Sequence, residues 1–255
     1  MSTLPATPSA SLDGQHALVT GGSSGIGLAA AAALGRAGAR VTLAARRPAE
    51  LEAACDVLRG EGIDCCGLPL DVTDPESVDA AVAASSAFDI LVNNAGMNRP
   101  KPLAQLSNDD IDAVLDLNVK AVFYVTRAVS RQMVARGQGG AIINVSSQMG
   151  HVGSPGRTLY CASKHAIEGM TKALAWELGE HGIRVNSLCP TFIETAMTAP
   201  MFAQAGFADW VRSRIALGRP GQLAEVMGAI VFLASAQSSL MTGSALMLDG
   251  GWTAA

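Results

Sequence analysis

The feature that most constrains the fold of this chain is a regular alternation of short apolar runs with longer Ala- and Leu-rich segments. The short runs have the length and residue types of strands, and the segments between them have helical length. Repetition of strand, helix and strand makes a parallel sheet with helices on both faces and right-handed crossovers. We therefore expect an α/β fold with one doubly wound parallel sheet of about seven strands. The predicted strands are residues 16–20, 40–45, 65–70, 89–93, 141–147, 184–189 and 244–249.

The 255 residues are interpreted as one domain. No linker rich in Pro, Gly or Ser interrupts residues 14–251, and a hydrophobic content of 49% is enough for a sizeable core. Residues 1–13 lack the charged and apolar regions of a signal peptide, so we expect a flexible tail before a domain over 14–255. The alternation breaks at about 190–221, where an insertion after a strand is typical of a substrate lid.

Charge and cysteine content exclude several classes of function. The 18 basic and 22 acidic residues are dispersed along the chain, so there is no basic stripe for a nucleic acid. No run of about 18 uncharged apolar residues would span a bilayer. The 5 cysteines and 4 histidines lack the spacing of a disulfide framework or a metal site. We expect reduced thiols, a cytoplasmic protein and no catalytic metal.

A glycine-rich turn directly follows the first predicted strand. The motif "TGGSSGIG" leads into the helical run "LAAAAALGRAG". Glycines at this junction let the backbone reverse tightly and let a pyrophosphate approach the amides of a helix N-terminus. The spacing G-x-x-x-G-x-G differs from the G-x-G-x-x-G fingerprint, yet its position favours a Rossmann-type dinucleotide site over simple helix packing. The residues expected to bind the cofactor here are Gly21, Ser23, Ser24, Gly25, Ile26 and Gly27.

The end of the second predicted strand indicates which dinucleotide binds. In such folds an acidic residue usually takes the adenosine ribose hydroxyls at this point. This chain has "AARR", in which Ala45 offers no side-chain acceptor. Arg46 and Arg47 bring two cations to the place where NADP carries its 2′-phosphate. We predict NADP, and NAD is the alternative if both arginines only solvate the end of the strand.

The stretch "TLYCASKHAIEG" places a tyrosine and a lysine one helical turn apart. Tyr160 and Lys164 are at positions i and i+4 and therefore share a helix face. A free phenol titrates near ~10, so it exchanges protons at neutral pH only if a nearby cation stabilises its anion. Lys164 can supply that charge, although an isolated Y-x-x-x-K is more often an exposed pair on a solvated helix.

Several motifs together resemble those of the short-chain dehydrogenase/reductase family, over nearly the whole chain. "TGGSSGIG" resembles the family's cofactor turn, "LDV" its adenine contact, and "NNAG" the segment that stabilises its central strand. "INVSS", followed by "YCASK", resembles the catalytic core and identifies Ser147 as the active serine. Asn118 in "LDLNVKAVF" matches the family's helix asparagine.

This resemblance implies a role for each matching residue. Tyr160 would be the general acid/base, Lys164 would lower its pKa and bind the nicotinamide ribose, and Ser147 would hydrogen-bond the substrate oxygen. The backbone of Asn118 would hold a water of the proton relay. Where the family usually has Gly, this chain has Thr191, which can enter positive φ only with strain. The further cofactor contacts implied are Asp71, Val72, Asn94, Ala95, Gly96, Tyr160, Lys164, Pro190, Thr191, Ile193 and Thr195.

Residues near the predicted strand ends favour a small polar substrate. "NNAGMNRPKP" has some similarity to sugar-acid dehydrogenases of the same family, so a hydroxy or keto compound such as a sugar acid is expected. The apolar residues of the predicted lid leave a reductase of 3-oxoacyl thioesters or cyclic ketones open. A nucleotide-sensing protein without turnover is the alternative from another class. The candidate substrate residues are Asn98, Arg99, Ser147, Gln148, His151 and Tyr160.

The family resemblance also implies an assembly. A homotetramer would form through the long helices around 108–136 and 158–180 and through the C-terminal strand. Apolar residues on those segments are equally compatible with burial in the core of one chain.

Overall fold

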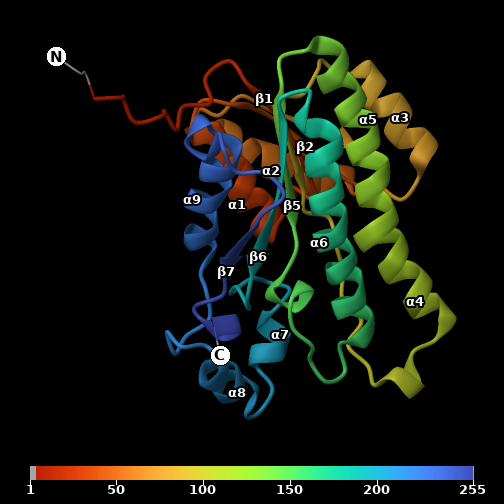
Figure 1. Cartoon of the computed structure of the whole chain (residues 1–255). Helices are drawn as coiled ribbons and strands as arrows, with labels where there is room; N and C mark the ends of the chain where they lie inside the picture. The colour runs from red at the N-terminus through yellow and green to blue at the C-terminus, as the bar shows by residue number, and fades with distance from the viewer. Residues whose placement is uncertain (1–3, 255) are drawn as a thin grey trace.

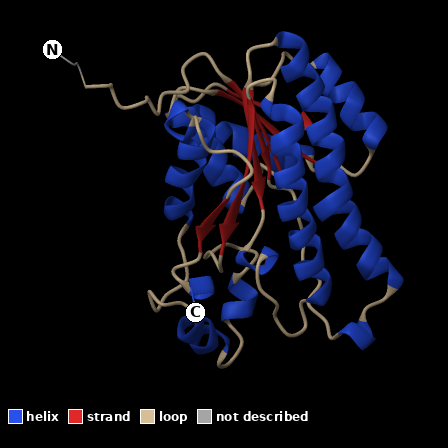
Figure 2. Cartoon of the chain, in the orientation of Figure 1, coloured by secondary structure: helices blue, strands red, loops and turns tan. Residues whose placement is uncertain are grey.

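The computed structural model describes residues 4–254, in which seven strands lie between two layers of helices (Figure 2). Their order in the sheet is β3-β2-β1-β4-β5-β6-β7, and every neighbouring pair is parallel. The predicted doubly wound α/β fold is confirmed. The strands are β1 (His16–Thr20), β2 (Arg40–Ala45), β3 (Cys65–Pro69), β4 (Ile90–Asn93), β5 (Gly140–Val145), β6 (Ile183–Pro190) and β7 (Ala245–Leu248).

Three helices, α3, α4 and α9, begin where the sequence supplies a capping group. α3 follows Asp74, whose carboxylate accepts hydrogen bonds from the first-turn amides, and α4 begins at a capping box formed by Ser107 and Asp110. The α-helices are α1 (Gly25–Arg36), α2 (Pro48–Gly60), α3 (Pro75–Ala84), α4 (Asn108–Leu115), α5 (Ala121–Arg136), α6 (Thr158–Gly179), α7 (Ala199–Phe202), α8 (Phe207–Arg214) and α9 (Leu223–Ala234).

Both faces of the sheet are covered because side chains alternate along each strand. Ala17 and Val19 of β1 pack into the core that includes α1 and α9, whereas Leu18 packs into the core formed with α3, α5 and α6. Figure 1 shows these two helix layers on opposite sides of the strands. Burial on both faces explains why the strands are continuous apolar runs in the sequence.

Several predicted boundaries differ from those of the structure by one or two residues, and two of the differences are informative. Leu12 is fully buried and its N–H donates to the carbonyl of Ala37 at 2.8 Å, so the folded part begins before the predicted start at residue 14. β5 ends at Val145 rather than at residue 147. Ser147 therefore lies just beyond the strand, where its side chain is free to act in a site. Residues 1–3 of the predicted tail lie outside the described part of the chain.

The insertion after β6 contains α7 and α8 and is organised by an aromatic cluster. Phe192 lies at the centre of this cluster, with ring-centroid distances of 5.4 Å to Phe207 and 5.9 Å to Trp252. Phe202 and Trp210 complete it. These contacts hold the two helices over the end of β6. The predicted lid thus has a small apolar core of its own.

Two expectations from composition can be compared with the structure directly. All five cysteines are free thiols, as predicted. Among residues 4–254, no helix is both long and apolar enough to cross a membrane.

Candidate active site

A cavity of about 670 Å³ opens at the carboxyl ends of the strands. The strand order reverses between β1 and β4, so the crossovers on either side lead away from each other and leave a crevice there. The segments that follow β1, β2, β4, β5 and β6 all contribute to the cavity wall. Residues far apart in the sequence therefore meet at one edge of the sheet (Figure 1).

The glycine turn after β1 has the backbone that a dinucleotide site needs. Gly21 and Gly25 have φ values of 62° and 54°, which disfavour other residues. A Cβ on Gly27 would lie 2.3 Å from the carbonyl oxygen of Gly21, so only glycine allows this close approach. Asn94 Nδ2 fixes the turn by donating to the carbonyl oxygens of Thr20 and Gly21 at 3.0 and 3.1 Å.

The start of α1 fits a pyrophosphate. The N-cap residue Ser24 makes no side-chain capping bond, so the first-turn amides of this 12-residue helix keep their donors for an anion. Predicted turn residues that line the cavity are Gly21, Ser23, Ser24, Gly25 and Ile26, together with Asn94, Ala95 and Gly96 after β4. Gly27 lies beneath the turn and acts by allowing its shape.

The adenosine end of the cavity carries the predicted cations. Arg46 and Arg47 both line it, and Arg47 Nη2 also pairs with Glu50 at 2.5 Å. Val72 lines the same region. Asp71 is turned towards Thr73, whose N–H and hydroxyl donate to its carboxylate at 3.0 and 2.7 Å. Of these two predicted residues, Val72 lies on the cavity wall and the Asp71 side chain is bonded to Thr73.

Ser147, Tyr160 and Lys164 meet at the other end of the cavity. Lys164 Nζ lies 5.6 Å from the centre of the Tyr160 ring, as expected for residues one turn apart on α6. The same ammonium donates to the carbonyl oxygen of Val145 at 2.9 Å, which ties α6 to the end of β5. Ser147 accepts a hydrogen bond from the N–H of Met149 at 3.1 Å and donates to Gln148 Oε1 at 2.9 Å.

The pKa values of this pair are set mainly by burial. Burial raises the pKa of Tyr160 to about 12, and the nearby Ser147 hydroxyl and Arg157 guanidinium act weakly in the opposite direction. In the ligand-free chain burial outweighs the neighbouring groups that lower the pKa of Tyr160, so the role expected of Lys164 stays a prediction for the complex with the cofactor. The Lys164 ammonium donates to the carbonyl oxygen of Val145, and burial lowers the pKa of Lys164 to about 8. The chain alone therefore holds Tyr160 as a protonated phenol.

Asn118 lies behind the cavity and not on its wall. It belongs to a π-helical turn, η2 (Asp116–Lys120), in which the N–H of Ala121 donates to the carbonyl of Asp116. Its side-chain oxygen accepts from the N–H of Met97 at 2.8 Å, and its amide donates to Ser163 Oγ at 3.1 Å. Because its side chain is engaged in these bonds, only its backbone is left for the implied role.

A buried polar network holds the helices of the site against the sheet. Asn93 Nδ2 donates to Thr126 Oγ1 and to Asn144 Oδ1, both at 2.9 Å. Asn144 Nδ2 in turn donates to Thr171 Oγ1 at 2.9 Å. The network joins β4, α5, β5 and α6, which agrees with the stabilising role implied for the "NNAG" segment. It fixes α6, and with it Tyr160, relative to the strand ends.

Two of the predicted substrate residues line the cavity and carry polar atoms without a hydrogen-bond partner. Asn98 and Gln148 line the wall beside the Ser147 and Tyr160 pair. Asn98 Oδ1 and Gln148 Nε2 are buried and have no hydrogen-bond partner in the described chain. Arg99 behaves differently, because it pairs with the buried Asp110 at 2.9 Å.

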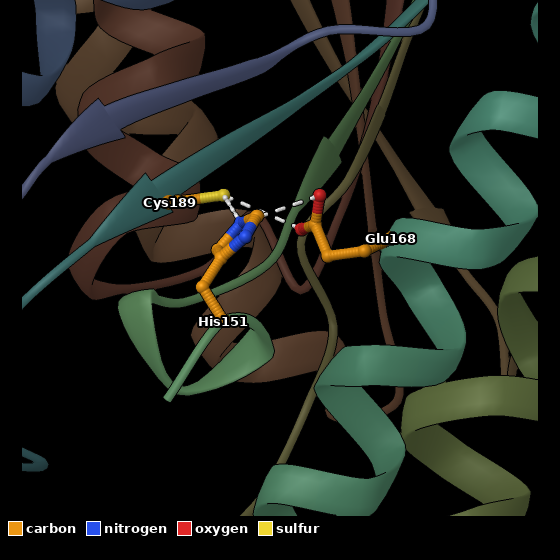
Figure 3. A group of neighbouring side chains, drawn as sticks. All are labelled: His151, Glu168 and Cys189. Carbon is orange, nitrogen blue, oxygen red and sulfur yellow. Dashed lines mark hydrogen bonds and ion pairs between the residues drawn. The ribbon is translucent and has the colours of Figure 1, made fainter. Parts of the chain in front are cut away.

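His151 turns away into a hydrogen-bonded cluster (Figure 3). Its Nε2 lies 3.5 Å from Glu168 Oε2 and 3.5 Å from Cys189 Sγ, and the thiol donates to Glu168 Oε1 at 3.3 Å. These atoms are close enough to share a metal ion. Burial, reinforced by the nearby Glu168 carboxylate, raises the pKa of Cys189 to about 12. The three side chains are held by their contacts with one another, and neither His151 nor Arg99 lines the cavity.

The segment after β6 follows an ordinary backbone path despite Thr191. No residue other than glycine has a positive φ between residues 4 and 254, so threonine replaces the family's glycine without strain. Thr191 Oγ1 is buried without a partner and lines the cavity. Pro190, Ile193 and Thr195, which are also predicted cofactor-binding residues, line the cavity as well.

One charged residue of the cavity wall was not among the predicted site residues. Arg157 is the N-cap residue of α6 and lines the cavity, and its Nη2 donates to Met201 Sδ at 3.4 Å. Burial lowers the pKa of its guanidinium. Its place three residues before Tyr160 could have identified it, because residues at i and i+3 lie on the same side of a helix.

The fold and this site define a dinucleotide-binding oxidoreductase, with a phenol, an ammonium and a hydroxyl gathered at the end of a phosphate-binding crevice. Comparison with known proteins agrees. A family model described as enoyl-(acyl carrier protein) reductase matches residues 21–253. The chain belongs to the short-chain dehydrogenase/reductase family of nicotinamide-dependent oxidoreductases.

Individual relatives are similar over almost their full length. Gluconate 5-dehydrogenase of Gluconobacter oxydans is 42% identical over 247 residues, covering 95% of this chain and 96% of the relative. A 3-oxoacyl-(acyl-carrier-protein) reductase of Thermotoga maritima is 41% identical over 246 residues, covering 94% and 98%. The crystal structure of a gluconate 5-dehydrogenase from Burkholderia cenocepacia, in complex with NADP and tartrate, has a TM-score of 0.93 at 38% identity, covering 96% of this chain and 98% of that one.

Proposed function

We propose that this protein interconverts a secondary alcohol and a carbonyl on a small polyhydroxylated compound, specifically a sugar acid. The observation that carries this proposal is that Asn98 and Gln148, on the wall of the cavity that also holds Tyr160, each have a buried polar atom without a hydrogen-bond partner. Each such atom costs about 1–3 kcal/mol until a ligand satisfies it. A substrate with several hydroxyls does so, and the two gluconate 5-dehydrogenases named above support that choice.

The proposed reaction assigns the proton to Tyr160 and the substrate oxygen to Ser147. The nicotinamide cofactor, when bound, would supply the hydride as NADPH or accept it as NADP⁺. In reduction, the Ser147 hydroxyl turns from Gln148 to the substrate oxygen, and the protonated phenol of Tyr160 donates to that oxygen. In oxidation the phenolate must form first, and the ammonium of Lys164, 5.6 Å from the ring, stabilises it.

The proposed cofactor is NADP rather than NAD. Arg46 and Arg47 line the adenosine end of the cavity, where guanidinium groups suit a 2′-phosphate. The Burkholderia cenocepacia structure, which contains NADP, supports this choice. The turn at Gly21 and the free amides at the start of α1 fit the pyrophosphate in either dinucleotide.

A reductase of 3-oxoacyl thioesters is the second candidate. Met97, Phe192, Met197 and Met201 give part of the cavity an apolar wall, which suits an acyl chain. The Thermotoga maritima relative supports this alternative. A cyclic ketone would meet the same wall. Rates measured with a thioester, a cyclic ketone and sugar acids on the same enzyme would separate these candidates.

Replacing Tyr160 by phenylalanine tests the proposed chemistry. Tyr160→Phe keeps the ring and removes the proton donor, so turnover should fall by roughly 10²- to 10⁴-fold while NADPH still binds. Tyr124→Phe, on α5, is the matched control because Tyr124 is the only other tyrosine in the chain. NADPH consumption and NADPH fluorescence would report turnover and binding. Unchanged turnover in Tyr160→Phe would remove Tyr160 from the mechanism and favour a nucleotide-sensing protein.

We also propose that four copies assemble in the cytoplasm through α5, α6 and the region of β7. Phe123 on α5 is 51% exposed and Trp176 on α6 is 90% exposed, and large apolar side chains of this kind are typical of subunit contacts. The free thiols suit a reducing compartment.

A further inference from the structure

Arg157 lies at the substrate end of the cavity, where Tyr160 and the predicted lid meet. It precedes Tyr160 by three residues, and its only side-chain hydrogen bond in the described chain goes to Met201 of α7. The other cations on the wall, among residues 4–254, are Arg46, Arg47 and Lys164. The first two lie at the adenosine end, and Lys164 is held by Val145. Arg157 is therefore the cation that remains for the substrate.

Comparison with a second half-buried arginine, Arg184, shows how incompletely Arg157 is paired. Burial lowers the pKa of both Arg157 and Arg184. Arg184 donates four hydrogen bonds, at 2.6–3.2 Å, to three backbone carbonyls and the hydroxyl of Ser238. Arg157 donates one, to a thioether sulfur, which is a weak acceptor. No carboxylate within residues 4–254 forms an ion pair with Arg157, so its remaining donors and its charge are left for a ligand.

We infer that Arg157 binds a carboxylate of the substrate and makes the protein selective for hydroxy and keto acids over neutral sugars. A guanidinium is a planar fork whose parallel N–H groups match the two oxygens of a carboxylate. In a site shielded from water, such a pair is far stronger than at a surface. Arg157 would anchor one end of the substrate, and Asn98 and Gln148 would bind its hydroxyls beside Tyr160. The inference rests on the proposed function and specifies its substrate class.

Matched pairs of compounds test this selectivity. The ratio of kcat/KM for 5-keto-D-gluconate to that for the neutral ketose L-xylulose should fall by roughly 10- to 100-fold in Arg157→Gln, mainly through KM for the acid. Arg157→Lys keeps the charge and loses the fork, so it should fall between wild type and Arg157→Gln. Arg131→Gln on α5, which replaces an exposed arginine, is the control and should keep the wild-type ratio.

Binding measured without turnover separates this inference from the proposed reaction. In the presence of NADP, tartrate should raise the melting temperature of the wild type, and threitol, its neutral tetrol analogue, should not. Arg157→Gln should lose the response to tartrate. Ligand-free Arg157→Gln should unfold no more easily than the wild type, because the guanidinium forms no strong bond within the described chain.

The possible contrary results distinguish a failure of the Arg157 inference from a failure of the proposed reaction. Equal responses of wild type and Arg157→Gln to tartrate would overturn the role of Arg157, whatever the activity. Reduction of L-xylulose with no reduction of the keto acid and no response to tartrate would overturn selectivity for acids and leave the proposed chemistry intact. A response to tartrate that depends on Arg157, without turnover of any carbonyl, would support the binding site and refute the proposed reaction.

Discussion

Replacing Lys164 by methionine should abolish turnover and at the same time stabilise the ligand-free fold. Lys164 is 6% exposed, and burial lowers its pKa from 10.5 to about 8. That shift corresponds to about 3 kcal/mol of destabilisation while the group is charged. Losing the hydrogen bond to Val145 lowers the stability of the variant by about 1–2 kcal/mol. Lys164→Met should therefore raise the free energy of unfolding by about 1–2 kcal/mol.

The stability difference between Lys164→Met and the wild type should become smaller as the pH rises. Below pH 8 the lysine is protonated in both the folded and the unfolded chain, and the full penalty applies. Between pH 8 and 10.5 the unfolded chain binds more protons than the fold, so the stability contributed by this group rises with pH. Above 10.5 the lysine is neutral in both states and its penalty is gone. The advantage of the methionine variant should shrink across that interval.

Urea unfolding of both proteins at several pH values would measure this difference. Lys172→Met, on the exposed side of α6, is the control and should change stability by less than about 0.5 kcal/mol. A Lys164→Met protein that is less stable than the wild type below pH 8 would refute the argument that burial of the charge dominates. Retained turnover would refute the catalytic role of the ammonium.

Two other substitutions test the cofactor and the assembly. Arg46→Asp should shift the ratio of rates with NADPH and NADH towards NADH, because a carboxylate repels the 2′-phosphate and can accept hydrogen bonds from ribose hydroxyls. Steady-state rates with both cofactors would measure this shift. A wild type that prefers NADH would contradict the assignment of NADP. Trp176→Glu should lower the molecular mass measured by light scattering, because a charge would replace an apolar side chain that is 90% exposed on α6. A wild type that is monomeric would refute the proposed tetramer.

Much of the fold could be predicted because its determinants are local. Each strand is a short apolar run and each crossover a helix, so all seven strands could be located from their residues, with errors of one or two residues at their ends. The turn at Gly21–Gly27 and the Tyr160–Lys164 spacing are local as well. Their geometry follows from the backbone and from helical periodicity.

The sequence by itself determined the parallel sheet, the phosphate-binding turn and the pairing of Tyr160 with Lys164, because each depends on neighbours within a few positions. The tertiary structure decided what surrounds them. Arg99 and His151 were expected in the cavity. Instead, Arg99 pairs with Asp110 and His151 lies beside Glu168, and both acidic residues are distant in sequence from their partners. The raised pKa of Tyr160 likewise depends on burial. Burial is a property of the packed chain as a whole, so no local pattern of residues could reveal it.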